Sequence, residues 1–116
     1  MSDKGVDLYW LLLDNQSTVD VFANRRLFKN IRESSRTLKI HSNGSHSVVS
    51  QVGYLKNYGD VWFDPNRIAN ILSLRNVKNK YPVTYNSTTD NTFIVHTPEK
   101  EVHFKQSKQG LYYHDT

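Results

Sequence analysis

The 116-residue sequence contains no cysteine and only one methionine, three prolines and five glycines. Without cysteine, the chain forms no disulfide and no thiolate metal site. Its apolar runs are short, and none approaches the roughly 20 residues that a membrane-spanning helix needs. The first residues, Met1 to Gly5, lack the apolar stretch of a secretory signal peptide. These absences predict a cytoplasmic protein with no membrane partner.

Apolar residues are also scarce, at 37% of the chain, so the seven Tyr, five Phe and two Trp must supply much of the core. A chain of this length holds one core, and we expect a single domain over residues 1–116. The net charge is +4, but the basic residues are dispersed. Their densest cluster, in residues 25–39, has helical spacing and predicts a short amphipathic helix with a solvated basic face. Nucleic acid is therefore an unlikely partner.

Short strand patterns dominate the remaining sequence. Asn43-Gly44 lies between two of them, and both residues tolerate positive φ, which predicts a β-hairpin over about residues 36–55. Residues 68–77 begin as a buried strand and continue as a helical turn, with Ser73 as its N-cap. The fold class is therefore all-β with one or two short helices. The other predicted strands are residues 8–14, 19–22, 60–63, 83–86, 92–96, 101–106 and 111–114.

The first strand ends abruptly in a carboxylate. Asp14 follows the apolar run Trp10–Leu13 and precedes a polar segment made of Asn15, Gln16, Ser17 and Thr18. Burying a lone carboxylate at a strand end costs roughly several kcal/mol unless the charge is paired, hydrogen-bonded or shared. Asp14 therefore either caps the following turn through its own backbone or takes part in chemistry.

The order of motifs resembles the aspartic protease of copia-type retrotransposon polyproteins, a relative of the retroviral proteases. That family carries an Asp-Ser-Gly-Ala-Ser/Thr motif after a Trp-hydrophobic-Leu lead, which Trp10, Leu13, Asp14 and Thr18 match. A second family motif, Asn-Leu-Leu-Ser-Val, is matched by residues 70–74. The segment Gly110-Leu111-Tyr112 resembles the end of the protease region, so the resemblance covers residues 10–113.

The resemblance implies a retropepsin-like closed β-barrel that is active as a C2 homodimer without metal or cofactor. It implies an aspartic endopeptidase that processes a retrotransposon polyprotein, located in the cytoplasm or within virus-like particles. Asp14 and its symmetry mate would share a proton and activate water. The hairpin would be a flap over the peptide. The expected flap and substrate-binding residues are Ser42, Asn43, Gly44, Ser45, Val48, Val49 and Ile71.

The chain departs from the family at two positions. The family has Ser or Thr and then Gly after the Asp, whereas this chain has Asn15 and Gln16. In the family, the hydroxyl makes a hydrogen bond across the dimer, and the Gly permits a tight backbone path. Asn15 retains a donor and an acceptor, but Gln16 adds a long side chain. The departure motivates an alternative function, a catalytically weak or silent protease-like dimer that binds peptides.

A third function class stays open, a small basic β-domain that binds single-stranded nucleic acid through aromatic side chains. Tyr54, Trp62 and Tyr85 are the candidates for stacking. The five histidines lack the compact spacing of metal ligands, and no metal site is expected.

Overall fold

The computed structural model describes residues 7–42, 45–88 and 91–116. The described residues form ten strands, a seven-residue α-helix and one turn of 3-10 helix, which confirms the predicted all-β class with short helices. The elements are β1 (Trp10–Asp14), β2 (Val21–Phe22), η1 (Arg25–Leu27), β3 (Lys29–Ser42), β4 (Ser45–Leu55), β5 (Gly59–Phe63), β6 (Asn70–Ser73), α1 (Leu74–Lys80), β7 (Val83–Asn86), β8 (Thr92–His96), β9 (Glu101–Gln106) and β10 (Tyr112–Asp115).

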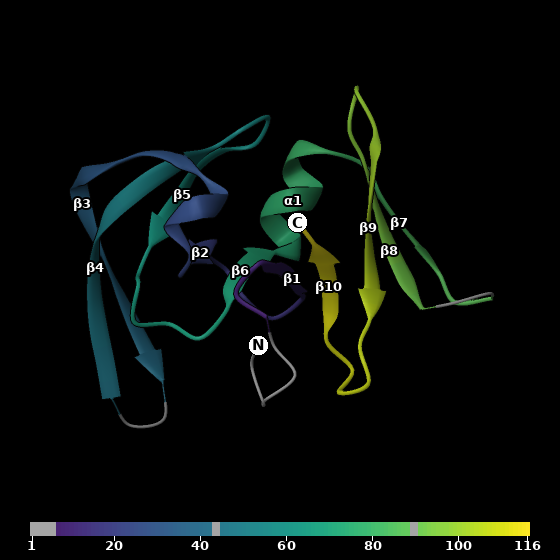
Figure 1. The fold of residues 1–116 in the computed structure, drawn as a ribbon, viewed down its shortest axis with the longest axis horizontal. Helices are drawn as coiled ribbons and strands as arrows, with labels where there is room; N and C mark the ends of the chain where they lie inside the picture. Colours follow the sequence, from purple (N-terminus) through teal and green to yellow (C-terminus); the bar gives the residue numbers. More distant parts are fainter. Residues whose placement is uncertain (1–6, 43–44, 89–90) are drawn as a thin grey trace.

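All ten strands belong to one sheet, in the order β3-β4-β5-β2-β6-β1-β10-β9-β8-β7. Figure 1 shows two lobes, with β3, β4 and β5 on one side, β7, β8 and β9 on the other, and α1 between them. Strand β1 lies near the centre, parallel to β6 and antiparallel to β10. Closure of the sheet into a barrel stays a prediction.

The core lies on one face of the central strands. Leu11 and Leu13 of β1 point into it, because alternate residues of a strand share a face. Phe28 packs edge-on against Phe22 and Phe63, with ring centroids 5.2 and 5.7 Å apart. Aromatic rings therefore supply much of the core, as the composition predicts.

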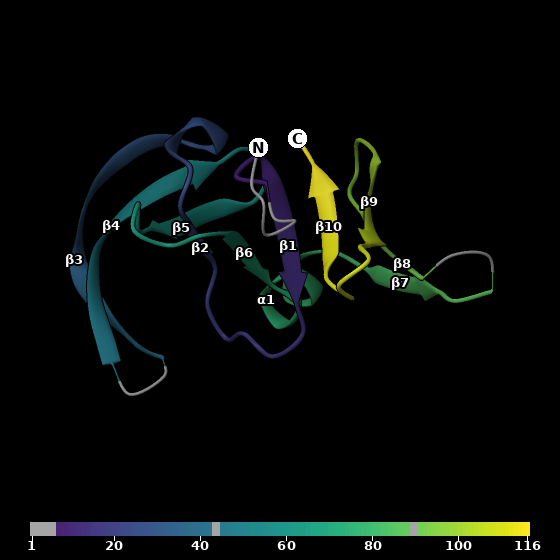
Figure 2. The same cartoon turned by 60° about the horizontal axis from the view of Figure 1, so that its bottom comes forward.

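The predicted hairpin is present and longer than expected. Strands β3 and β4 pair along residues 29–55, and two register shifts on β3 mark bulges. The tip residues Asn43 and Gly44 lie outside the described residues. In Figure 2 the long hairpin projects from the body of the molecule on one side.

The predicted basic helix is wrong. Only Arg25–Leu27 forms a 3-10 turn, and Asn30 has a positive φ of 58° before the chain continues as β3. The bulges insert extra residues into β3, so its apolar and basic residues lose the two-residue period of a regular strand. Pairing with β4 therefore outweighs a local spacing that resembles a helix.

The segment between β6 and α1 follows the prediction closely. Strand β6 ends at Ser73, whose Oγ accepts a hydrogen bond from the backbone N–H of Asn76 at 3.3 Å and caps α1. Strands β7, β8 and β9 have the predicted bounds. No helix of the described chain is long and apolar enough to cross a membrane.

Candidate active site around Asp14

Asp14 ends the central strand β1 beside Ser73 of β6. Its Oδ1 accepts a hydrogen bond from the backbone N–H of Gln16 at 2.8 Å, so the carboxylate caps the turn that follows. Asp14 is half-buried, not deeply buried as its place after an apolar run predicts. Its other oxygen, Oδ2, has no hydrogen-bond partner within the described part of the chain. One carboxylate oxygen is therefore held and the other is open.

The loop after Asp14 exposes the two residues at which the chain departs from the family motif. Asn15 and Gln16 are both exposed, as is Thr18. Ser17 Oγ donates to the carbonyl oxygen of Val19 at 2.7 Å and accepts from the Val19 N–H at 3.2 Å, which closes a tight turn. The Gln16 side chain is therefore exposed to solvent in the single chain.

A row of apolar side chains crosses the sheet on the same face as Asp14. The strand register places Leu12 of β1 beside Ile71 of β6, Ile71 beside Val21, and Val21 beside Trp62. Paired residues point to the same face, and Asp14 lies two residues beyond Leu12 on that face. Ile71, a predicted substrate-binding residue, therefore lies on the same face of the sheet as Asp14 and one strand away from it.

The two predicted flap valines have different surroundings. Val48 is 60% exposed, whereas Val49 is 4% exposed, as expected for neighbours on opposite faces of a strand. Only Val48 offers apolar surface to a ligand. Ser42 and Ser45 pair at the end of the hairpin, but their side chains, like Asn43 and Gly44, lie outside what the structure describes.

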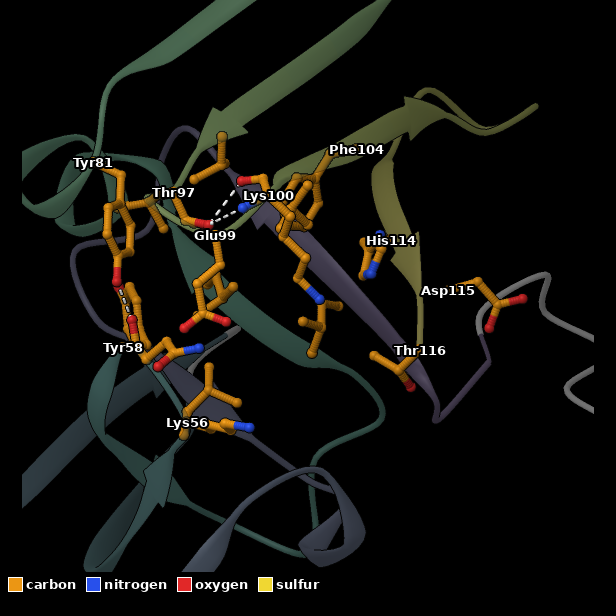
Figure 3. A pocket seen from close by; sticks show the side chains of 17 residues that line it. Lys56, Tyr58, Tyr81, Thr97, Glu99, Lys100, Phe104, His114, Asp115 and Thr116 are labelled. Carbon is orange, nitrogen blue, oxygen red and sulfur yellow. Dashed lines mark hydrogen bonds between the residues drawn. The ribbon is translucent and has the colours of Figure 1, made fainter.

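A cavity of the described chain lies elsewhere. It has a volume of about 600 Å³ and an apolar floor that includes Leu11, Val95 and Phe104. Its rim carries residues of both charges, among them Lys56, Glu99, Lys100 and Asp115, which Figure 3 labels. Leu11 and the final residues of the chain place this cavity toward the start of β1, away from Asp14. None of the predicted site residues lines it.

The sequence interpretation missed Asp20, which is the buried carboxylate near Asp14. Asp20 is 8% exposed. It accepts hydrogen bonds from the Ser73 N–H at 2.7 Å, the Tyr58 hydroxyl at 2.9 Å and the Asn76 side-chain amide at 3.3 Å. Burial raises the pKa of Asp20 above its ordinary value, although the three hydrogen bonds oppose the rise. The signal in the sequence was an acidic residue inside the apolar strand pattern of residues 19–22.

Asn70, at the start of the second family motif, is fully buried and uses all its hydrogen-bonding capacity. Its Oδ1 accepts from the backbone N–H groups of Ala23 and Asn24, at 2.8 and 2.9 Å. Its Nδ2 donates to the carbonyl oxygens of Leu8 and Trp10, at 2.7 and 3.0 Å. The amide thus joins three segments of backbone, and its role is structural.

The three aromatic candidates for nucleic-acid stacking do not form one surface. Tyr54 and Trp62 lie on β4 and β5, whereas Tyr85 lies on β7 at the far end of the sheet order. The hydroxyl of Tyr85 is bonded to Asn91, and its ring packs on Phe93 with centroids 4.6 Å apart. A continuous stacking platform over these three rings is therefore absent.

Comparisons with models of protein families, with curated proteins and with solved structures found no match to this chain. Among the described residues, no group of three or more His, Asp and Glu side chains could hold a metal ion. The geometry around Asp14 and the motif resemblance are therefore the features that point to a function.

Proposed function

We propose that the chain is an aspartic endopeptidase that processes a retrotransposon polyprotein, with Asp14 and its symmetry mate as the catalytic pair. The observation that carries this proposal is the state of the Asp14 carboxylate. It ends the central strand, one oxygen is fixed by the Gln16 N–H, and the other is open on the face that carries Ile71. A rigid strand end that presents one open carboxylate oxygen suits a group that must contact water and substrate.

The chemistry needs two carboxylates that share one proton. The ionised carboxylate takes a proton from water, and the protonated one donates a hydrogen bond to the scissile carbonyl oxygen. Like charges about 3 Å apart do not both ionise readily, so the pair titrates with two separated apparent pKa values. The resulting hydroxide adds to the carbonyl carbon, and the carbon–nitrogen bond breaks after a proton moves to the leaving amine.

A C2 homodimer supplies the second carboxylate, because the chain has one copy of the motif. The exposed side chains of Asn15 and Gln16 flank Asp14 and would meet the partner at the two-fold axis. Asn15 has both a donor and an acceptor for a hydrogen bond across that axis. The closed retropepsin-like barrel belongs to the same proposal.

The β3–β4 hairpin is the proposed flap over an extended peptide. An extended peptide adds to a strand edge through main-chain hydrogen bonds, while side-chain pockets give specificity. Exposed Val48 on the hairpin and half-buried Ile71 beside the Asp14 row are the apolar surfaces that fit such pockets. Val49 is buried and would act on the shape of the hairpin.

The second candidate is a silent protease-like dimer that binds peptides without cleaving them. Gln16 motivates it, since a side chain replaces the usual glycine beside the catalytic residue. The Gln16 side chain is exposed in the single chain, and this exposure favours the enzyme over the silent dimer. If the site is silent because of Gln16, Gln16→Gly should produce cleavage activity that the wild type lacks.

The test compares peptide cleavage by the wild type, Asp14→Asn and Asp7→Asn. Asp7 is a matched control, because its Oδ1 accepts the Tyr9 N–H at 2.7 Å in the same kind of turn. We expect the wild type and Asp7→Asn to cleave a peptide library at acidic to neutral pH, and Asp14→Asn to lose at least about 10³-fold in kcat. Equal cleavage by all three, or none by the wild type, would overturn the proposal.

A further inference from the structure

Three segments that are distant in the sequence meet at Asp20. The carboxylate lies between the start of α1, with its N-cap Ser73 and its residue Asn76, and the turn between β4 and β5, which supplies Tyr58. The backbone of Asp20 also takes part, since its carbonyl oxygen accepts from the Trp62 N–H at 3.1 Å. Asp20 therefore joins the lobe of β3, β4 and β5 to the start of the helix.

Ser73 and Asn76 also hold the loop that follows Asp14. Ser73 Oγ donates to the carbonyl oxygen of Ser17 at 2.7 Å, and the side-chain amide of Asn76 lies 3.3 Å from the carbonyl oxygen of Thr18. Ser73 is also the register partner of Asp14. Two of the three residues that bind the Asp20 carboxylate thus also bind the backbone of residues 17–18.

The opposite end of α1 fixes the position of Tyr58. Lys80 Nζ donates to the carbonyl oxygen of Tyr58, and its ammonium lies 5.6 Å from the centre of the Tyr58 ring. The hydroxyl of Tyr81 donates to the carbonyl oxygen of the adjacent Asn57. The turn that carries Tyr58 is therefore held against α1 at two points, and its hydroxyl is directed to Asp20.

Among the described residues, the three groups that hydrogen-bond to the Asp20 carboxylate are all donors. An ionised carboxylate only accepts hydrogen bonds, so it satisfies the Ser73 N–H, the Tyr58 hydroxyl and the Asn76 amide together. An isosteric amide has only one acceptor oxygen, and its NH₂ group would face another donor. The site therefore requires an acceptor on both oxygens, which an aspartate supplies and an asparagine does not.

We infer that Asp20 is a positioning residue, whose carboxylate fixes Ser73, Asn76 and Tyr58 so that the loop of residues 15–19 presents Asp14 in its catalytic position. Asp20 does not contact the reacting atoms. It acts through the helix start that binds the loop. The effect of Asp20 on catalysis rests on the proposed function. Its effect on the order of the loop does not depend on that function.

The test uses Asp20→Asn and Tyr58→Phe in the full chain, with Tyr81→Phe as the matched control. Tyr81→Phe removes a hydroxyl bond to the same turn without removing a partner of Asp20. Two quantities are measured: amide hydrogen exchange of Gln16 and Val19, whose N–H groups bond within the loop, and the kinetics on a peptide that the wild type cleaves. Tyr58→Phe provides a milder variant that keeps the charge, in case Asp20→Asn does not fold.

We expect exchange of both amides to rise about tenfold in Asp20→Asn and by a smaller factor in Tyr58→Phe, and to change least in Tyr81→Phe, where Lys80 still holds the turn and every partner of Asp20 remains. We expect kcat to fall about tenfold or more in Asp20→Asn while KM changes less than about twofold, because a misplaced catalytic group affects the chemical step. Exchange that matches the wild type in both Asp20→Asn and Tyr58→Phe would overturn the inference. Increased exchange in Asp20→Asn and Tyr58→Phe, combined with a wild type that cleaves no peptide, would support the positioning of the loop and reject the protease.

Discussion

Two nearby aspartates differ in their surroundings, and that difference separates a structural carboxylate from a catalytic candidate. Asp14 has one backbone donor and an open oxygen, whereas Asp20 has three donors and is 8% exposed. A buried carboxylate surrounded by donors stabilises the arrangement around it. An open carboxylate at a strand end remains available to a ligand.

The stability of the chain should depend on pH through Asp20. Burial raises the folded pKa of Asp20 above its ordinary value, so between the two pKa values the folded protein retains a proton that the unfolded chain has released. The stabilisation is complete below about pH 4 and is lost as the pH rises through the folded pKa. The free energy of unfolding of Asp20→Asn minus that of the wild type should therefore increase from about pH 4 to about pH 7.

Urea unfolding of both chains at several pH values measures this difference. The missing acceptor in Asp20→Asn lowers the free energy of unfolding by the same amount at every pH. The informative quantity is therefore the change with pH of the difference between the two free energies of unfolding. Asp64→Asn serves as a control, because Asp64 is equally buried and caps a turn through Asn66. A difference between Asp20→Asn and the wild type that stays flat or falls with pH would contradict the account of Asp20.

Asn70→Ala should strongly destabilise the fold. The substitution leaves the N–H groups of Ala23 and Asn24 and two carbonyl oxygens of the first strand region without their partner. Unpaired buried groups cost about 1–3 kcal/mol each and are not additive, so we expect a loss of at least about 3 kcal/mol. Chemical denaturation measures it beside the exposed control Asn66→Ala. A loss below about 1 kcal/mol would show that the four hydrogen bonds of the Asn70 side chain contribute little to stability.

Gly53 allows strand β4 of the hairpin to pass close to the aromatic core. A Cβ at this position would lie 2.5 Å from Cδ2 and 2.6 Å from Cε2 of Phe28, and 3.1 Å from Cγ1 of Ile31. Phe28 is held edge-on between Phe22 and Phe63, so its ring has little freedom to move. Strand β4 can therefore pass Phe28 only with glycine.

Gly53→Ala should lower the free energy of unfolding by about 1–3 kcal/mol through overpacking. Ser47→Ala, an exposed substitution on the same strand, should change it by less than about 0.5 kcal/mol. Thermal or chemical denaturation compares the two variants. Equal stability of Gly53→Ala and the wild type would mean that Phe28 moves aside freely, against the packing described.

Local patterns predicted the elements whose residues interact with near neighbours. The strands in residues 83–106 alternate regularly, and Ser73 caps the residues immediately after it, so sequence spacing was sufficient. The basic segment from Arg25 onward failed because its pairing with β4 and its bulges depend on residues up to 25 positions away. Asp20 was missed for the same reason, since Ser73 and Asn76 lie more than fifty residues further along.

The whole molecule is less compact than a typical domain of its length. The Cα radius of gyration is 14.2 Å, compared with about 13 Å for a compact chain of this size. The projecting hairpin and the two lobes account for the excess (Figure 1). Apolar side chains such as Val48 and Ile68 are 60% and 80% exposed. A dimer with a bound peptide would cover such surface, in agreement with the proposed function.

Mixing wild type with Asp14→Asn and measuring peptide cleavage tests whether the catalytic site is shared between two chains. When subunits exchange randomly, an equal amount of Asp14→Asn added to a fixed amount of wild type converts half of the wild-type chains into mixed dimers with one Asp14. A catalytic site shared between two chains predicts that cleavage falls to about half and continues to fall as more variant is added. Cleavage that is unaffected by excess variant, or wild type that never cleaves, would contradict it.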